Sequence, residues 1–129
     1  MRGKAAPDEK PLHWVGGSKR DLMAMPQAVI CHIGTALSVA QYGGKHPDAK
    51  PWKGLGSGIF EVVSDFDTNT FRAAYAVRFE HAVYVLHCFQ KKSTRGVNTA
   101  KTDVDLIERR LKAAKTEYEA QYGPVKQKR

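Results

Sequence analysis

Several features that define particular protein classes are scarce in this sequence. Two cysteines in 129 residues, Cys31 and Cys88, are too few for a disulfide framework. Both lie in apolar surroundings, so we expect them to be buried and free. No apolar run is long enough to span a membrane, and the N-terminus lacks the hydrophobic segment of a secretory signal. We therefore expect a cytoplasmic protein without membrane contacts.

Familiar catalytic motifs are missing as well. The sequence has no Walker-type glycine loop and no paired carboxylates on one element of the kind that metal nucleases use. The five histidines are scattered, with no HxxxH pair, which gives little support for a zinc site. We therefore expect no cofactor, and any cleavage of a phosphodiester would proceed without a metal.

Basic residues, by contrast, are abundant. Lys and Arg number 21 against 13 acidic residues, which gives a formal charge of +8 and a pI near 9.6. Such a charge favours nucleic acid or an acidic protein as partner. The length suits a single domain over residues 1–129, with 1–10 and 123–129 as loose termini.

The order of apolar and turn residues predicts a small α+β fold. Ser18 with Asp21, and Thr102 with Asp105, resemble capping boxes at helix starts. Segment 83–90 is apolar on both faces and is expected to be an interior strand. The expected elements are a strand at 11–16, a helical hairpin at 18–42 restarting at Pro26, a loop at 45–58, strands at 59–66, 70–79 and 83–90, and an amphipathic helix ending near Gly123.

Alternation along 70–79 places Arg72 and Arg78 on one face, separated by two alanines. The small alanines would leave a shallow floor on which two guanidinium groups bind phosphate oxygens. The alternative is an ordinary solvated face of the sheet. Tyr75 falls on the opposite, largely aromatic face.

Further cations cluster at the segment ends. Lys45, Lys50 and Lys53 precede the three-strand meander. The last strand ends in Lys91 and Lys92, with Arg95 four residues after Lys91. If strands 70–79 and 83–90 are neighbours, these cations converge on one edge of the sheet, where their summed field attracts an anionic chain.

Acid–base catalysis would need titratable groups near these cations. His46 and His87 titrate in the right range, and Tyr75 could assist. Each has a structural alternative: His87 as a hydrogen-bonded core histidine, His46 as a turn residue, and Tyr75 as a core aromatic.

Four segments together resemble one known family. GGKHPDAKPWKGLGSGIFEVV, FRAAYAVRF, YVLHCFQKKSTRGVNT and the following DLIERRL are similar to the phage-derived HigB-like branch of the RelE/ParE toxin superfamily. The resemblance covers residues 11 to 118. It implies a small twisted antiparallel sheet with two N-terminal helices and one C-terminal helix.

The resemblance also implies a function, namely the toxin of a type II toxin–antitoxin module. Many such toxins are mRNA interferases: metal-independent endoribonucleases of the hydrolase class that cleave mRNA in the ribosomal A site and inhibit translation. The implied partners are mRNA on the ribosome and an antitoxin with a helix-turn-helix domain. The candidate catalytic residues are Arg72, Lys91, Lys92, Arg78 and His87. The candidate RNA-binding residues are Lys50, Lys53, Tyr75, Arg95 and His46.

Two departures from the family pattern leave the acid–base pair unassigned. Val63 stands where many relatives have an arginine, and Tyr118 and Tyr122 do not map clearly onto a base-stacking tyrosine.

Two other functions stay open. A ParE-like protein would share the scaffold but poison DNA gyrase. A non-catalytic basic module would bind nucleic acid without cutting it.

Overall fold

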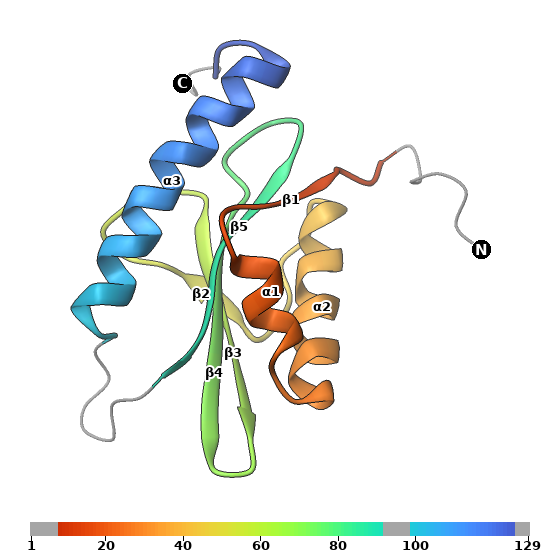
Figure 1. The fold of residues 1–129 in the computed structure, drawn as a ribbon. Coiled ribbons are helices and arrows are strands. Elements are labelled where there is room, and N and C mark those ends of the chain that lie inside the picture. Colours follow the sequence, from red (N-terminus) through yellow and green to blue (C-terminus); the bar gives the residue numbers. More distant parts are fainter. Residues whose placement is uncertain (1–7, 92–98, 126–129) are drawn as a thin grey trace.

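A computed structural model describes residues 8–91 and 99–125 of the chain. These residues form an α+β fold, and the predicted fold class, with two N-terminal helices and one C-terminal helix, is confirmed (Figure 1). The elements in chain order are β1 (Leu12–Trp14), α1 (Ser18–Met23), α2 (Gln27–Gln41), β2 (Ala49–Pro51), β3 (Ile59–Phe66), β4 (Asn69–Ala76), β5 (Val83–Lys91) and α3 (Lys101–Tyr122).

The five strands form one sheet in the order β1-β5-β4-β3-β2. β3, β4 and β5 make the predicted antiparallel meander, and β2 adds to its edge antiparallel to β3. β1 pairs parallel to β5, with Leu12 opposite Val83. The sheet is therefore mixed, and the expectation of a wholly antiparallel sheet was wrong at this edge. The long connection between β1 and β5 permits parallel pairing, which a short hairpin would not.

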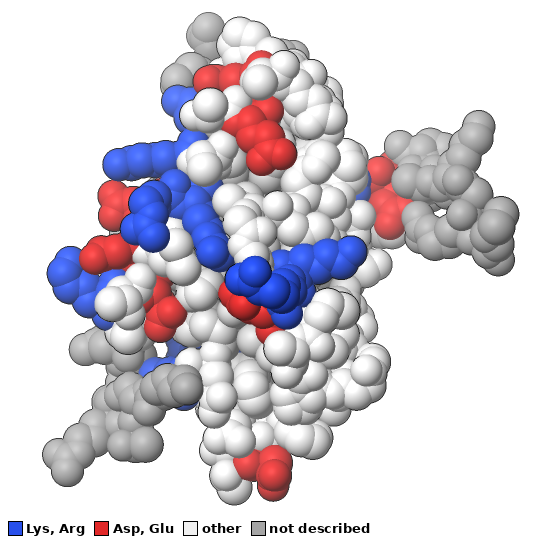
Figure 2. All heavy atoms as spheres, viewed as in Figure 1, with Lys and Arg blue, Asp and Glu red and all other residues white. Residues whose placement is uncertain are grey.

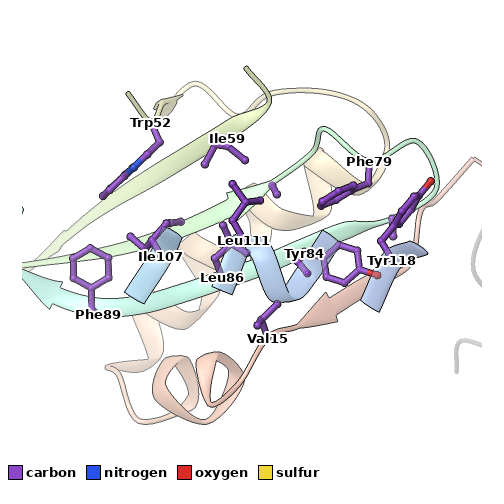
Figure 3. Packing of buried hydrophobic residues seen from close by; sticks show 14 residues of the cluster. Val15, Trp52, Ile59, Phe79, Tyr84, Leu86, Phe89, Ile107, Leu111 and Tyr118 are labelled. Carbon is purple, nitrogen blue, oxygen red and sulfur yellow. The ribbon is translucent and has the colours of Figure 1, made fainter. Parts of the chain in front are cut away.

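Helices cover both faces of the sheet (Figure 1). On one face Ile33 of α2 packs in a cluster with Val62 and Tyr75. On the other face Ile107 and Leu111 of α3 belong to a second cluster, shown in Figure 3. β4 and β5 lie between these two layers and are buried along nearly their whole length. The prediction that segment 83–90 is an interior strand is confirmed.

Both predicted capping boxes are wrong. α1 follows Gly17 and α3 follows Ala100, and neither helix has a side-chain cap. Ser18 is completely buried, and its hydroxyl donates to the carbonyl of Val85 instead of to the helix start. The Ser18 hydroxyl thus makes a tertiary hydrogen bond, whereas the local sequence pattern predicted that it caps the helix.

The segment expected to be a loop, 45–58, contains the short strand β2. Lys50 stands opposite Glu61 of β3, and Pro51 ends the strand. Because β2 is the outermost strand, the missing N–H of Pro51 leaves no gap in the ladder. β2 thereby holds the lysines of this segment against the sheet.

β5 contains an irregularity that changes which side chains face α3. Ala74 stands opposite His87, but the next residue, Tyr75, stands opposite Val85, so Leu86 is left over as a bulge. Leu86 and Phe89 both belong to the α3-side cluster, although strict alternation would separate them. The extra residue therefore turns His87 toward α3.

The cysteines partly match expectation. Both are free, and Cys88 is buried, but Cys31 is exposed on α2, so its predicted burial was wrong. Burial raises the pKa of the Cys88 thiol to about 12. Among the described residues, we find no helix with both the length and the apolar content to cross a membrane.

Candidate functional site

A cavity of about 710 Å³ opens between β2, β3, β4 and the first turns of α3. Its charged lining residues are Lys50, Lys53, Arg72, Lys101, Glu61 and Asp105. We call this cavity the basic cleft. Figure 2 shows Lys and Arg side chains, with some Asp and Glu, gathered on the side of the molecule where α3 lies. Four cations against two acids give the cleft a net positive charge that suits a phosphate-bearing ligand.

Arg72 is the buried cation of the basic cleft. It projects from β4, is only 9% exposed, and its Nη1 donates to the carboxylate of Glu61 at 2.7 Å. Its Nε is buried and has no partner among the described residues. Glu61 thus fixes the orientation of the guanidinium group at the base of the cleft.

His87 of β5 contacts the first turn of α3. Its Nε2 lies 2.8 Å from an Asp103 carboxylate oxygen in the first turn of α3, and its ring stacks on Phe89 with centroids 4.6 Å apart. Nδ1 is buried without a partner among the described residues. His87 is therefore a buried, hydrogen-bonded histidine on the same face as Arg72. Its catalytic assignment stays a prediction.

The predicted phosphate floor between Arg72 and Arg78 is wrong. Ala74 and Ala76 are fully buried beneath α3, so neither a floor nor a solvated face exists there. β4 ends before Arg78, whose guanidinium donates to the carbonyls of Leu55 and Ser57. Alternation correctly assigned the face, but it carries no information about what covers that face.

Arg78 instead braces the glycine-rich turn that leads into β3. Gly58 has a φ of +82°, and a Cβ placed there would lie 2.7 Å from the Cβ of Arg78. Only glycine allows this close approach. Arg78 thus helps shape the segment that carries Lys53, and its own catalytic assignment remains an untested prediction.

The predicted lysines fall into two groups. Lys50 and Lys53 are exposed on the rim of the basic cleft. Lys91 ends β5 opposite Thr70 and, by alternation from Phe89, shares the face of Arg72. Lys92 and Arg95 lie outside the described residues. The predicted convergence of cations is therefore observed for Lys50, Lys53 and Arg72, which all line the basic cleft.

Two other candidates lie away from the cleft. Tyr75 is 1% exposed, stacks on Phe60 in the α2-side cluster, and burial raises its pKa to about 12. His46 lies beside His32 of α2, with ring centroids 5.6 Å apart. Their RNA-binding assignments stay untested predictions, but neither side chain lines the basic cleft.

Sequence reasoning missed Lys101, Glu61 and Asp103 as members of this region. Glu61 is the one charged residue in the apolar run IFEVV, a signal of a buried partner. Asp103 lies near the start of α3, and its local sequence gives no sign that it contacts His87 of β5. No local pattern shows that α3 closes over β4 and β5.

Comparison with known proteins identifies the family. A positively charged cleft on a small α+β scaffold is typical of nucleic-acid-binding proteins. The family model described as Phage derived protein Gp49-like (DUF891) matches residues 20–112. The chain therefore belongs to this family, which is a RelE-type toxin family. Searches of curated proteins and of solved structures returned no match.

Proposed function

We propose that this protein is the toxin of a type II toxin–antitoxin module and that it cuts mRNA on the ribosome without a metal in the cleavage step. The observation that carries the proposal is the basic cleft, with one buried arginine held at its base and exposed lysines at its rim. Family membership supports the toxin role. The partner that controls it would be an antitoxin with a helix-turn-helix domain.

The arrangement suits metal-free transfer of a phosphoryl group. Attack by the ribose 2′-OH builds negative charge on the phosphorane, and preorganised cations stabilise that charge best when water is excluded. Arg72 is such a cation, because Glu61 already fixes its orientation. Lys50 and Lys53 would bind neighbouring phosphates, and Lys91 lies on the same face of the sheet.

Proton transfer is assigned to His87 within this proposal. Asp103 holds Nε2 and leaves Nδ1 as the nitrogen that can exchange a proton with RNA. Arg72 stands opposite Phe89, two residues from His87, which is about 7 Å along a strand. Because His87 is buried, RNA can reach Nδ1 only if neighbouring side chains move aside while the contact with Asp103 is kept.

The test is induced expression followed by mapping of mRNA 5′ ends. New ends within translated codons are expected for the wild-type chain and for Arg109→Ala, which removes an exposed α3 arginine outside the cleft lining. They should be absent for Arg72→Lys, which keeps the charge beside Glu61 but loses the planar fork. Intact mRNA in growth-arrested wild-type cells would refute cleavage and favour gyrase poisoning.

A further inference from the structure

A second cluster of titratable side chains lies outside the basic cleft. His32 belongs to α2, and His46 and Asp48 belong to the segment before β2. One potential ligand atom from each lies within 4.8 Å of the others. We propose that these three residues bind a divalent transition metal, with Zn²⁺ as the ion that two imidazoles and a carboxylate suit best.

The distances require only small side-chain rotations to close on an ion. Asp48 Oδ2 lies 2.8 Å from His32 Nε2 and 3.9 Å from His46 Nδ1. Ligands bonded at about 2.0–2.1 Å in a tetrahedral zinc site stand roughly 3.3–3.5 Å apart. Of the two separations that involve Asp48, one must widen and the other must shorten by about half an ångström, and the exposed Asp48 side chain has the freedom to adjust both. The ligand nitrogens of His32 and His46, which lie within 4.8 Å of each other, must also approach to this separation.

His32 is held as metal-bound histidines usually are. Its Nδ1 lies 2.7 Å from Oγ of Ser64, which is itself 2% exposed on β3. Without an ion, the 2.8 Å contact between Nε2 and the Asp48 carboxylate requires Nε2–H as the donor, so Nδ1 of the neutral ring accepts from the Ser64 hydroxyl. Binding of an ion at Nε2 would move the ring proton to Nδ1, which would then donate to the same serine oxygen. The buried serine thus fixes the orientation of the ring in both states.

His46 presents a lone pair in the cluster. The amide N–H of Asp48 donates to His46 Nδ1 at 3.0 Å, so this nitrogen carries the lone pair. A metal ion would replace this hydrogen bond by a coordination bond at the same atom. Three protein ligands leave a fourth tetrahedral position for water.

The same contacts could also be interpreted as a Ser64–His32–Asp48 catalytic triad. The burial of Ser64 excludes this interpretation, because a substrate cannot reach its hydroxyl. The metal site has a structural consequence instead. Because Asp48 precedes β2 and Lys50 lies within β2, an ion here ties α2 to the strand that lines the basic cleft. The cleavage chemistry proposed above does not use this ion.

The test is Co²⁺ titration of the metal-free full-length chain, followed by Zn²⁺ competition against a chelator. Exposed Cys31 is a neighbouring soft ligand, so the titration is repeated in Cys31→Ser. We expect one bound Co²⁺ with tetrahedral d–d absorption in both proteins. His46→Gln and Asp48→Asn should each weaken Zn²⁺ binding at least tenfold, whereas His81→Gln, at an exposed histidine outside the cluster, should not.

Three results would overturn the proposal: Zn²⁺ affinity weaker than about 1 mM, equal affinity in wild type and both cluster variants, or a thiolate charge-transfer band that disappears in Cys31→Ser. Far-ultraviolet circular dichroism of each variant separates loss of a ligand from loss of the fold. None of these measurements involves RNA. The outcome is therefore independent of whether the protein cuts mRNA.

Discussion

The buried Arg72–Glu61 ion pair gives the sharpest stability prediction. Both side chains are about nine-tenths buried and 2.7 Å apart, so removing one partner leaves a charge without compensation. Glu61→Leu should lower the free energy of unfolding by about 3–5 kcal/mol. For 129 residues the total is roughly 6–19 kcal/mol. The variant therefore loses a large share of its stability, or roughly 1.5–2.5 M in urea midpoint at an m-value near 2 kcal/mol/M.

Urea unfolding followed by circular dichroism measures this loss, and two comparisons isolate its cause. In Glu61→Leu with Arg72→Met the whole pair is replaced by apolar groups, so most of the stability should return. Asp105→Asn breaks the exposed Lys101–Asp105 pair of the same cleft and should cost under about 1 kcal/mol. A Glu61→Leu cost as small as that of Asp105→Asn, with no recovery in the double variant, would refute the reasoning.

Further predictions concern the glycine-rich turn before β3, the pH dependence of the buried thiol and phenol groups, the reactivity of the cysteines, and RNA binding. Gly58→Ala should destabilise the protein by about 1–3 kcal/mol more than Gly54→Ala in urea unfolding, because both glycines have positive φ but only Gly58 contacts Arg78; equal losses would contradict this. Burial raises the pKa of Cys88, Tyr75 and Tyr84 to about 12, from 9.0 for the thiol and 10.0 for each phenol. The folded protein therefore favours the neutral form of each group. Their contribution to stability is complete below pH 9 and is lost as pH rises to about 12. Urea midpoints at pH 8 and 10.5 should show that fall, and an unchanged midpoint would count against it. A thiol reagent at pH 8 should modify one cysteine, Cys31, in the native protein and two in denaturant; two in the native protein would contradict the burial of Cys88. Lys53→Ala should lower the salt dependence of RNA affinity by about one unit of slope, whereas Lys19→Ala on α1 should not; equal slopes would remove Lys53 from the interface.

The sequence predicts the sheet well where its periodicity is undisturbed. The expected strand at 59–66 coincides with β3, and 83–90 lies within β5. Alternation also assigns Arg72 to the face opposite Tyr75, as the two packing clusters confirm. Period-two patterns carry this information because successive side chains point to opposite faces.

Tertiary effects limit what the sequence predicts about the site. The bulge at Leu86 turns His87 toward α3, and no glycine or proline in β5 marks it. The packing of α3 over β4 buries Ala74 and Ala76, which alternation alone leaves exposed. The approach of His46 to His32 likewise depends on how α2 lies against the sheet, so their spacing in sequence gives no metal motif.

The chemical ends of cleaved mRNA provide the most direct test of the proposed mechanism. Purified protein is added to ribosomes stalled with a defined codon in the A site, and the termini of the cut message are determined. Attack by the 2′-OH predicts a 2′,3′-cyclic phosphate and a 5′-hydroxyl, formed by the wild type and not by Arg72→Lys. A 5′-phosphate with a 3′-hydroxyl, or intact message, would contradict the account.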